Sequence, residues 1–190
     1  MPSRLRIVGG RFRGRQLAVP DGRGTRPTTD RVREALFNIL EHRDPPVLAG
    51  ATVLDLFAGT GALGLEALSR GAEQVVFVEK DRKVCALLKA NVETLGAQDE
   101  TRVLCADAAW LGQADVKASL VFVDAPYGKG LVGPALTQAS AKGWIADGAI
   151  VVVELDAEEG LDVPPGFVSC DTRTYGGTKL VLLAFAACRG

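Results

Sequence analysis

An aspartate and three glycines lie within one stretch of ten residues, which is the part of this sequence most suited to binding a ligand. Residues 53–64 read V-L-D-L-F-A-G-T-G-A-L-G, an apolar run that contains Asp55 and is followed by a G-x-G-x-x-G turn. Glycines at such a turn permit positive φ angles and allow a ligand to approach the bare backbone. The helix expected over residues 62–69 presents free N–H groups in its first turn. The stretch therefore predicts a site for a nucleotide-type cofactor.

The spacing of Gly59, Gly61 and Gly64 matches the dinucleotide-binding fingerprint, but Asp55 argues against NAD. A pyrophosphate at this helix N-terminus would bring negative charge close to a buried carboxylate, and like charges there are costly. S-adenosylmethionine (SAM) has no phosphate and carries a sulfonium and an ammonium group, which an acid at this position would favour. An acid-bearing strand followed by F-A-G-T-G also resembles motif I of class I SAM-dependent methyltransferases. We expect SAM as the cofactor, and a glycine-rich turn without a ligand is the alternative.

Acidic residues also end the other predicted parallel strands. Glu79 ends the run Q-V-V-F-V-E, and Asp107 and Asp124 follow the next two strands. Since ligands bind at the carboxyl ends of the strands in such sheets, we expect these acids and Asp55 around one crevice. Glu79 is placed to accept hydrogen bonds from both ribose hydroxyls of the cofactor, and Asp107 from the exocyclic amine of adenine. Each acid taken alone could equally cap a helix or a loop.

A second group of residues suited to chemistry is Asp124-Ala125-Pro126-Tyr127, after the fourth predicted strand. An amine conjugated to a base or carbonyl is a poor nucleophile because its lone pair is delocalised. A carboxylate and a backbone carbonyl that accept its two N–H groups can aim that lone pair at a methyl donor. Asp124 supplies the carboxylate, Ala125 the carbonyl and Tyr127 a stacking platform for a flipped base.

This tetrapeptide resembles the [D/N]-P-P-[Y/F] motif of methyltransferases that modify exocyclic or amide nitrogens. It departs from the motif at Ala125, where that motif has proline. The carbonyl remains, and Pro126 still holds the preceding residue extended, so we expect activity to survive. A plain turn at the end of a strand is the alternative interpretation.

The elements that must position these residues alternate between strand and helix. Two further strands joined through Gly176-Gly177 read as a closing hairpin. We therefore predict an α/β fold: a Rossmann-like, doubly wound, seven-stranded sheet with one antiparallel strand. Alternating apolar residues in the first 19 positions predict a small N-terminal β-hairpin, so that residues 1–27 form a basic arm and residues 28–190 the catalytic domain. A first helix, with Thr28 or Thr29 as its N-cap, is expected to run to about residue 42. Further helices are expected over 62–69, 81–96 and 131–141, and strands over 53–57, 74–79, 102–105, 120–123, 149–155, 167–175 and 179–185.

Composition places the chain among soluble proteins of one domain. It has 190 residues, 47% of them hydrophobic, and no apolar run of membrane-spanning length or signal-peptide pattern, so we expect a cytoplasmic protein without membrane contact. Four widely scattered cysteines argue against a zinc site and are read as reduced thiols. His42 is the only histidine, which nearly excludes multi-histidine metal sites and histidine-based catalysis, and no metal is expected.

Charge is distributed unevenly along the chain. Residues 1–33 hold nine arginines against two aspartates, a balance of +7, and the total of −1 leaves −8 for the remainder. A basic arm on an acidic body suits a polyanionic substrate, and arginine favours forked phosphate contacts and stacking on bases. A solvated N-terminus without a partner is the alternative. The arginines expected to contact nucleic acid are Arg11, Arg13, Arg15, Arg26 and Arg31.

Four segments together resemble one family. They are R-I-V-G-G-R-F-R-G-R, the block R-P-T-T-D-R-V-R-E-A-L-F-N-I-L (Arg26 to Leu40), L-D-L-F-A-G-T-G-A-L-G-L-E-A-L-S-R-G-A and D-A-P-Y. The chain is similar to the bacterial 16S ribosomal RNA guanine-N2 methyltransferases of the RsmD type, and the Arg26 to Leu40 block is the most selective of the four. The resemblance implies a monomer that methylates N2 of one guanine in 16S rRNA, in an assembled or partly assembled small subunit.

The resemblance also implies the residues of the site. Catalysis is expected from Asp124, Ala125, Pro126 and Tyr127. Cofactor binding is expected from Asp55, Phe57, Gly59, Gly61, Glu79, Lys80, Asp107 and Ala108.

Other functions remain open at this point. DNA adenine-N6 and protein glutamine-N5 methyltransferases use the same tetrapeptide, but the glutamine enzymes typically begin it with Asn, and a DNA enzyme usually carries a recognition domain for which 190 residues leave little room. An RNA-binding module with an inactive SAM fold is disfavoured by the intact Asp124 and Tyr127. An NAD oxidoreductase would need a histidine or lysine near the nicotinamide, and His42 is expected outside the crevice.

Overall fold

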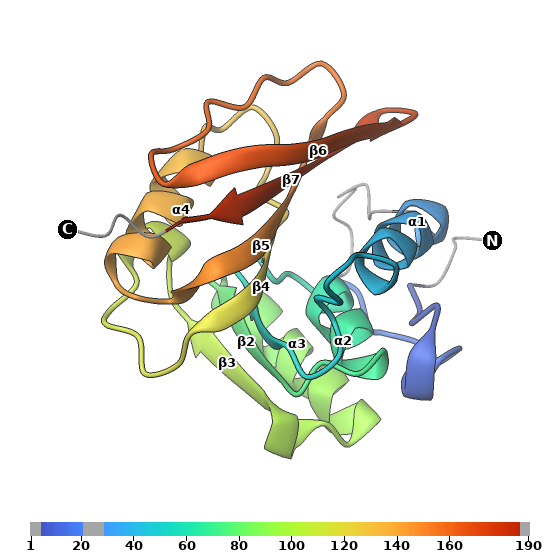
Figure 1. Cartoon of the computed structure of the whole chain (residues 1–190). Coiled ribbons are helices and arrows are strands. Elements are labelled where there is room, and N and C mark those ends of the chain that lie inside the picture. Colours follow the sequence, from blue (N-terminus) through green and yellow to red (C-terminus); the bar gives the residue numbers. More distant parts are fainter. Residues whose placement is uncertain (1–4, 21–28, 187–190) are drawn as a thin grey trace.

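A mixed sheet with helices on both faces organises the chain (Figure 1). The computed structural model describes residues 5–20 and 29–186. The strands are β1 (Thr52–Asp55), β2 (Gln74–Glu79), β3 (Thr101–Cys105), β4 (Ala118–Val123), β5 (Ile145–Asp156), β6 (Phe167–Tyr175) and β7 (Thr178–Phe185). The α-helices are α1 (Asp30–Glu41), α2 (Ala62–Ser69), α3 (Arg82–Leu95) and α4 (Val132–Ala141), and short 3-10 helices are η1 (Gly10–Phe12), η2 (Gln98–Glu100) and η3 (Ala108–Trp110).

The strands lie in the order β3-β2-β1-β4-β5-β7-β6. Strands β1 to β5 all run parallel to one another. Strand β7 is antiparallel to both of its neighbours, β5 and β6. Parallel neighbours need crossover connections, and the reversal of strand order between β1 and β4 makes the sheet doubly wound. The predicted fold, with seven strands and one antiparallel strand, is confirmed.

Two apolar clusters cover the two faces of the sheet. One joins α1, α2 and α3 to alternate residues of the strands, and includes Phe37, Phe77 and Phe122. The other packs α4 and η3 against the opposite face, around Leu136 and Trp144. Strands β1, β2 and β4 are almost continuously apolar because both of their faces are buried. Figure 1 shows α4 on the other side of the sheet from α1.

Strand β5 begins earlier than the sequence suggests. The prediction started it at residue 149, but Ile145 already pairs with Ala118 of β4. The pairing then shifts register before Leu120 meets Ile150. Asp147-Gly148 reads as a turn signal, and here it lies in the bulged part of the strand, where Gly148 takes φ +79°.

The N-terminal segment pairs with itself and packs on the body. The Ile7 N–H donates to the Arg15 carbonyl at 3.0 Å and the Leu17 N–H to the Leu5 carbonyl at 2.9 Å, which gives the predicted antiparallel hairpin a single bridge, Arg6 with Gln16. Leu5, Ile7 and Leu17 are buried in the α1–α2–α3 cluster. The proposed boundary between residues 27 and 28 lies outside the described residues and stays a prediction.

Buried charged side chains hold the hairpin in place. Glu66 on α2 is fully buried and accepts the N–H groups of Val8 and Gly9, both at 2.8 Å. Arg33 on α1 is 1% exposed and donates to the Arg6 carbonyl at 2.6 Å. Helix α1 itself begins after Thr29, whose hydroxyl accepts the Val32 N–H as an N-cap, as predicted. Across residues 5–20 and 29–186, no helix combines the length and the apolar character needed to cross a membrane.

Candidate active site at the carboxyl edge of the sheet

The strand order reverses between β1 and β4, which puts the ends of these neighbouring strands at the switch point of the sheet. Asp55 is the last residue of β1, and Asp124 directly follows β4. Ligands of doubly wound sheets bind outside the carboxyl ends of the strands at this point. Both predicted elements, the glycine-rich turn and D-A-P-Y, therefore lie on neighbouring strands at the same edge.

The three glycines of the turn have different structural roles. Gly59 has φ +53°, and a Cβ added there would meet no atom within 4 Å, so the turn is bare on that side. Gly61 has φ +83° and caps α2, and a Cβ there would lie 2.3 Å from Leu88 Cδ1. At Gly64 a Cβ would lie 2.3 Å from the Phe77 ring, because α2 packs closely on β2. Gly59 is thus the position where a ligand can approach the backbone.

Asp55 is 1% exposed and accepts the Gly64 N–H through Oδ2 at 3.2 Å. Its Oδ1 is buried and has no hydrogen-bond partner among the described residues. Burial raises the pKa of Asp55 to about 7, with a further rise from the charge of Glu79 and against the opposing interactions of the Gly64 and Phe57 backbone. A buried acceptor atom without a partner beside a bare glycine turn fits a ligand that carries cationic groups.

Glu79 ties two backbone segments together. Its Oε2 accepts the Gly59 N–H at 3.0 Å, and its Oε1 accepts the Asp81 N–H at 2.8 Å. Each carboxylate oxygen has a second acceptor position, so ribose hydroxyls can still bind. Lys80, which follows, is exposed, and Phe57 is half-buried against the α4 cluster.

Asp107 lies beyond the end of β3 and caps η3, where its Oδ1 accepts the Ala109 N–H at 2.9 Å. Ala108, the first residue of η3, is buried. Asp107 is exposed, so its remaining acceptor positions are accessible. Asp107 therefore has the capping role that was the alternative to ligand binding. Its contact with adenine stays a prediction.

The D-A-P-Y segment leaves β4 beside the end of β5. Asp124 is half-buried, and its pKa is well above its ordinary value because of burial, then because of the negative charges of Glu154 and Asp55. Ala125 is buried and Pro126 is exposed. Tyr127 is 37% exposed, and its hydroxyl donates to Glu154 Oε1 at 3.1 Å. The exposed ring can therefore offer a face to a ligand while its hydroxyl is held.

Two residues near this site were not singled out from the sequence. Glu154 on β5 is 3% exposed and belongs to the same acidic group as Asp55 and Asp124. Burial and the negative charges of Glu154 and Asp124 raise the pKa of Tyr127, and a side-chain interaction with Thr178, the first residue of β7, opposes that rise. The signal available for Glu154 was a lone acid in the apolar run V-V-V-E-L, comparable to Asp55 in V-L-D-L-F.

The predicted RNA-binding arginines are spread over the molecule. Arg11 donates to both carboxylate oxygens of Glu100, at 2.7 and 2.6 Å, and Arg15 donates to the Thr94 carbonyl. Arg13 and Arg31 are exposed and form no ion pair within the described part of the chain. Arg26 lies outside the described residues.

The tip of the hairpin is distant from the acidic edge. Its Phe12 N–H donates to the Ser69 hydroxyl at the end of α2, and Glu100 directly precedes β3, so Arg11 lies where the strands begin. Strand β2 has six residues, and a strand rises about 3.3 Å per residue, so roughly 20 Å separates the two edges. Farther along the arm, Asn91 accepts the Ala18 N–H and donates to the Thr60 carbonyl in the glycine turn.

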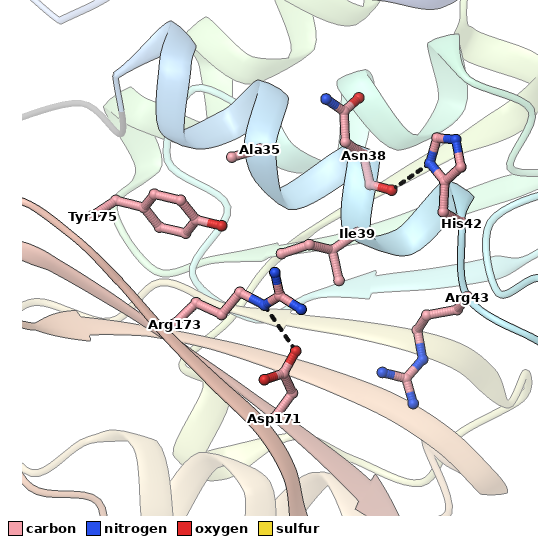
Figure 2. A pocket seen from close by; sticks show the side chains of 8 residues that line it. All are labelled: Ala35, Asn38, Ile39, His42, Arg43, Asp171, Arg173 and Tyr175. Atoms are coloured by element: carbon pink, nitrogen blue, oxygen red, sulfur yellow. Dashed lines mark hydrogen bonds and ion pairs between the residues drawn. The ribbon is translucent and has the colours of Figure 1, made fainter.

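A groove of about 470 Å³ lies between α1 and β6 (Figure 2). Arg43 and Arg173 extend into it from opposite sides, and Arg173 Nε donates to Asp171 at 3.0 Å. Tyr175 marks the end of the groove nearest the turn that leads to Thr178. His42 lines this groove and not the acidic edge, as expected. The lining residues are Ala35, Asn38, Ile39, His42, Arg43, Asp171, Arg173 and Tyr175.

No group of three or more histidine, cysteine, aspartate or glutamate side chains in the described part of the chain is arranged to hold a metal ion. The acids at the carboxyl edge surround instead a bare glycine turn and a half-exposed tyrosine. This combination suits a positively charged organic cofactor on one side and a planar, amine-bearing substrate on the other.

Comparisons with known proteins give a consistent result. Residues 5–184 match a family model described as "Conserved hypothetical protein 95". The chain is 46% identical over 161 residues to the ribosomal RNA small subunit methyltransferase D of Escherichia coli K12, an alignment that covers 85% of this chain and 79% of that protein. It is 35% identical over 176 residues to the Haemophilus influenzae protein of the same name, covering 90% and 89%.

Solved structures show the same relationship. The Escherichia coli protein yhhF superposes with a TM-score of 0.84 at 40% identity, covering 97% of this chain and 99% of that one. An RNA methyltransferase from Salinibacter ruber in complex with S-adenosyl-L-homocysteine has a TM-score of 0.64 at 14% identity, covering 85% and 94%. The second likeness is one of fold alone.

Proposed function

This chain belongs to the family of the ribosomal RNA small subunit methyltransferase D proteins, and we propose that it transfers a methyl group from SAM to the exocyclic N2 of one guanine in 16S rRNA. The observation that carries the proposal is the placement of Asp124 and Tyr127 at the end of β4, next to the glycine turn that follows β1. We further propose that the enzyme acts as a monomer on an assembled or assembling small subunit.

The cofactor side of the site is formed by the turn after β1 and the end of β2. Bound SAM supplies an electrophilic methyl group on a sulfonium. The open side of Gly59 admits the cofactor, Asp55 presents a buried oxygen without a hydrogen-bond partner among the described residues, and Glu79 offers acceptor positions for a ribose. Phe57, Gly61, Lys80, Asp107 and Ala108 complete the proposed cofactor site. Their residue types and positions around this edge support the assignment.

Methyl transfer to an exocyclic amine depends on the geometry of its two N–H groups. The Asp124 carboxylate and the Ala125 carbonyl accept them, which aims the nitrogen lone pair toward the methyl donor. Pro126 restricts Ala125 to extended backbone, so the carbonyl keeps its direction without the proline that the [D/N]-P-P-[Y/F] motif has at that position. Tyr127 stacks on the extruded base.

Protonation of Asp124 is linked to substrate binding. Burial and the negative charges of Glu154 and Asp55 raise the pKa of Asp124, so its protonated form is favoured relative to an ordinary aspartate when no amine is present. Two N–H donors facing the carboxylate stabilise its charged form, so the arriving amine lowers that pKa and favours the acceptor state. The proton of the methylated nitrogen can leave to water, and no separate general base is required.

Recognition of RNA needs cationic surface beyond the catalytic edge. The groove between α1 and β6 presents Arg43 and Arg173, and its end at Tyr175 lies near the turn that positions Thr178. We propose that a strand leading to the target base lies along this groove. Arg13 and Arg31 add exposed charge, whereas Arg11 and Arg15 must exchange their contacts with Glu100 and Thr94 to bind a phosphate.

The test is methylation of small-subunit particles isolated from cells that lack this protein. Purified enzyme and labelled SAM are added, and nucleoside mass spectrometry together with nuclease mapping identifies the product. The proposal expects one N2-methylguanine in 16S rRNA. If the labelled methyl group appeared instead on adenine N6 of DNA or on glutamine N5 of a protein, the proposed function would be wrong and the chain would have that other activity. Binding of SAM without transfer to any of these substrates would indicate an inactive fold.

A further inference from the structure

Glu154 is a buried acid next to the proposed catalytic segment that the mechanism above does not use. It lies on β5 with 3% exposure. Val123 of β4 pairs with Val153 of β5, so the next residues on the two strands are Asp124 and Glu154. In parallel strands, residues in register lie side by side and point to the same face. The two acids are therefore neighbours at the end of the sheet.

The same carboxylate also holds Tyr127. The phenol donates to Glu154 Oε1 at 3.1 Å, although Tyr127 is 27 positions earlier in the chain and its ring is 37% exposed. Residues 126–130 are all exposed, so the loop gives the ring little packing of its own. The hydroxyl of an otherwise exposed aromatic side chain is thus held by a buried acid, with a further side-chain interaction from Thr178.

We propose that Glu154 is a positioning residue for methyl transfer, which fixes the Tyr127 ring where the base stacks and shares one proton with Asp124. This inference rests on the proposed function. Loss of the ring's fixed position weakens base engagement by roughly three- to tenfold, since binding must then order a free side chain. Loss of the neighbouring acid changes the pH at which Asp124 becomes a carboxylate.

Two adjacent carboxyl groups resist being charged together, so the pair keeps one proton over a range of pH. While that proton is on Asp124, the substrate amine lacks its charged acceptor, so a charged Glu154 beside it delays the formation of the Asp124 carboxylate as pH rises. Protonated Glu154 still accepts the Tyr127 hydroxyl through its carbonyl oxygen. The titratable groups shown to interact with Glu154 are Asp124 and Tyr127, and Asp55 from β1 acts on Asp124, whereas the Lys179 amine on β7 donates to the Glu159 carbonyl.

Two substitutions separate the two roles. Glu154→Gln keeps an oxygen for the Tyr127 hydroxyl and removes the acid. We expect its single-turnover rate to rise at lower pH than that of the wild type and to converge with it at high pH, with KM for small-subunit particles unchanged. Glu154→Leu removes the acceptor, so it should raise KM as much as Tyr127→Phe, and the double variant should be no worse than either. The matched control is Asp156→Asn, because Asp156 is an acid on the same strand whose carboxylate accepts the Glu158 N–H. This variant should change neither the pH profile of the rate nor KM.

A readout without catalysis keeps this inference separate from the proposed function. The chain has only two tyrosines, so ¹³Cζ-tyrosine NMR gives two signals, and Tyr175→Phe assigns them. Glu154→Leu should shift the Tyr127 signal, whereas Glu154→Gln and Asp156→Asn should shift it less. Superimposable pH profiles for wild type and Glu154→Gln, or an unmoved Tyr127 signal in a folded Glu154→Leu protein, would overturn the inference. If no rRNA is methylated by the wild type, the proposed function fails, and the NMR result still decides the Tyr127 contact.

Discussion

The Gly59 N–H donates to Glu79 Oε2 at 3.0 Å, a bond that joins the glycine turn after β1 to the end of β2. The residue proposed to bind the ribose therefore also shapes the backbone that the cofactor approaches. A substitution at Glu79 has two effects, the loss of a ligand for the ribose and the release of the turn. These two effects can be separated by replacing Glu79 with glutamine, because the side-chain amide keeps an oxygen that can accept the Gly59 N–H.

Glu79→Ala is expected to weaken SAM binding by about 1.5–3 kcal/mol, the range for hydrogen bonds to a charged group. Glu79→Gln keeps an acceptor for Gly59 and should lose less, because only the charge and one ribose contact change. Isothermal titration calorimetry measures both, and thermal unfolding reports whether the turn has loosened. Unchanged SAM affinity in the alanine variant would remove Glu79 from the cofactor site.

Asp55 gives the protein a specific pH dependence of stability. Its pKa is about 7 in the folded protein, whereas an unperturbed aspartate has a pKa of 3.8, so the folded protein holds a proton that the unfolded chain releases. The resulting stabilisation is fully present below pH 3.8 and is lost as pH rises through 7. Relative to Asp55→Asn, the wild type should lose on the order of 1 kcal/mol per pH unit between about pH 4 and 7. Urea unfolding of both proteins across this range tests it, and a constant difference would contradict the assignment.

The salt dependence of RNA binding can distinguish the two proposed cationic surfaces. Each phosphate contact that is lost should reduce the log–log slope by roughly 0.7 to 0.9. Replacing Arg43 and Arg173 by alanine tests the groove, and replacing Arg11, Arg13 and Arg15 tests the arm. Arg102→Ala is the control, because Arg102 lies on β3 and forms an ion pair with Asp115 at 2.5 Å. SAM affinity should stay constant throughout, and an unaltered slope in either set would exclude that surface from RNA binding.

Local sequence signals predicted much of this structure. Helix α2 and strand β2 have the predicted bounds, because glycines and an acid mark their ends. The pairing of β4 with β5 is not encoded locally, so the importance of Glu154 could not be recognised from a single acid within an apolar run. The contact of Arg11 with Glu100, 89 positions away, was invisible for the same reason. Long-range partners decide whether an acid or an arginine is structural or available to a ligand.

The last prediction separates the roles of Asp124 and Tyr127 in the transfer step. Asp124→Ala removes the charged acceptor of the amine protons, so the single-turnover rate should fall while RNA affinity changes little. Asp124→Asn keeps one acceptor oxygen without the charge and should be intermediate. Its rate should also lose the pH dependence that titration of Asp124 gives to the wild type. Rapid-quench methylation of small-subunit particles measures these rates.

Tyr127→Ala removes a stacking surface worth about 1–3 kcal/mol per base, so both target engagement and rate should fall. From the sequence, Tyr127→Phe would be nearly silent unless the hydroxyl has a hydrogen-bond partner, and the structure supplies that partner in Glu154. The phenylalanine variant should therefore fall between wild type and alanine, because its ring remains but is no longer held. Filter binding of small-subunit particles measures engagement beside the single-turnover rate. An Asp124→Ala enzyme with the wild-type rate would remove the tetrapeptide from the mechanism, and a silent Tyr127→Phe would show that the ring needs no support from its hydroxyl.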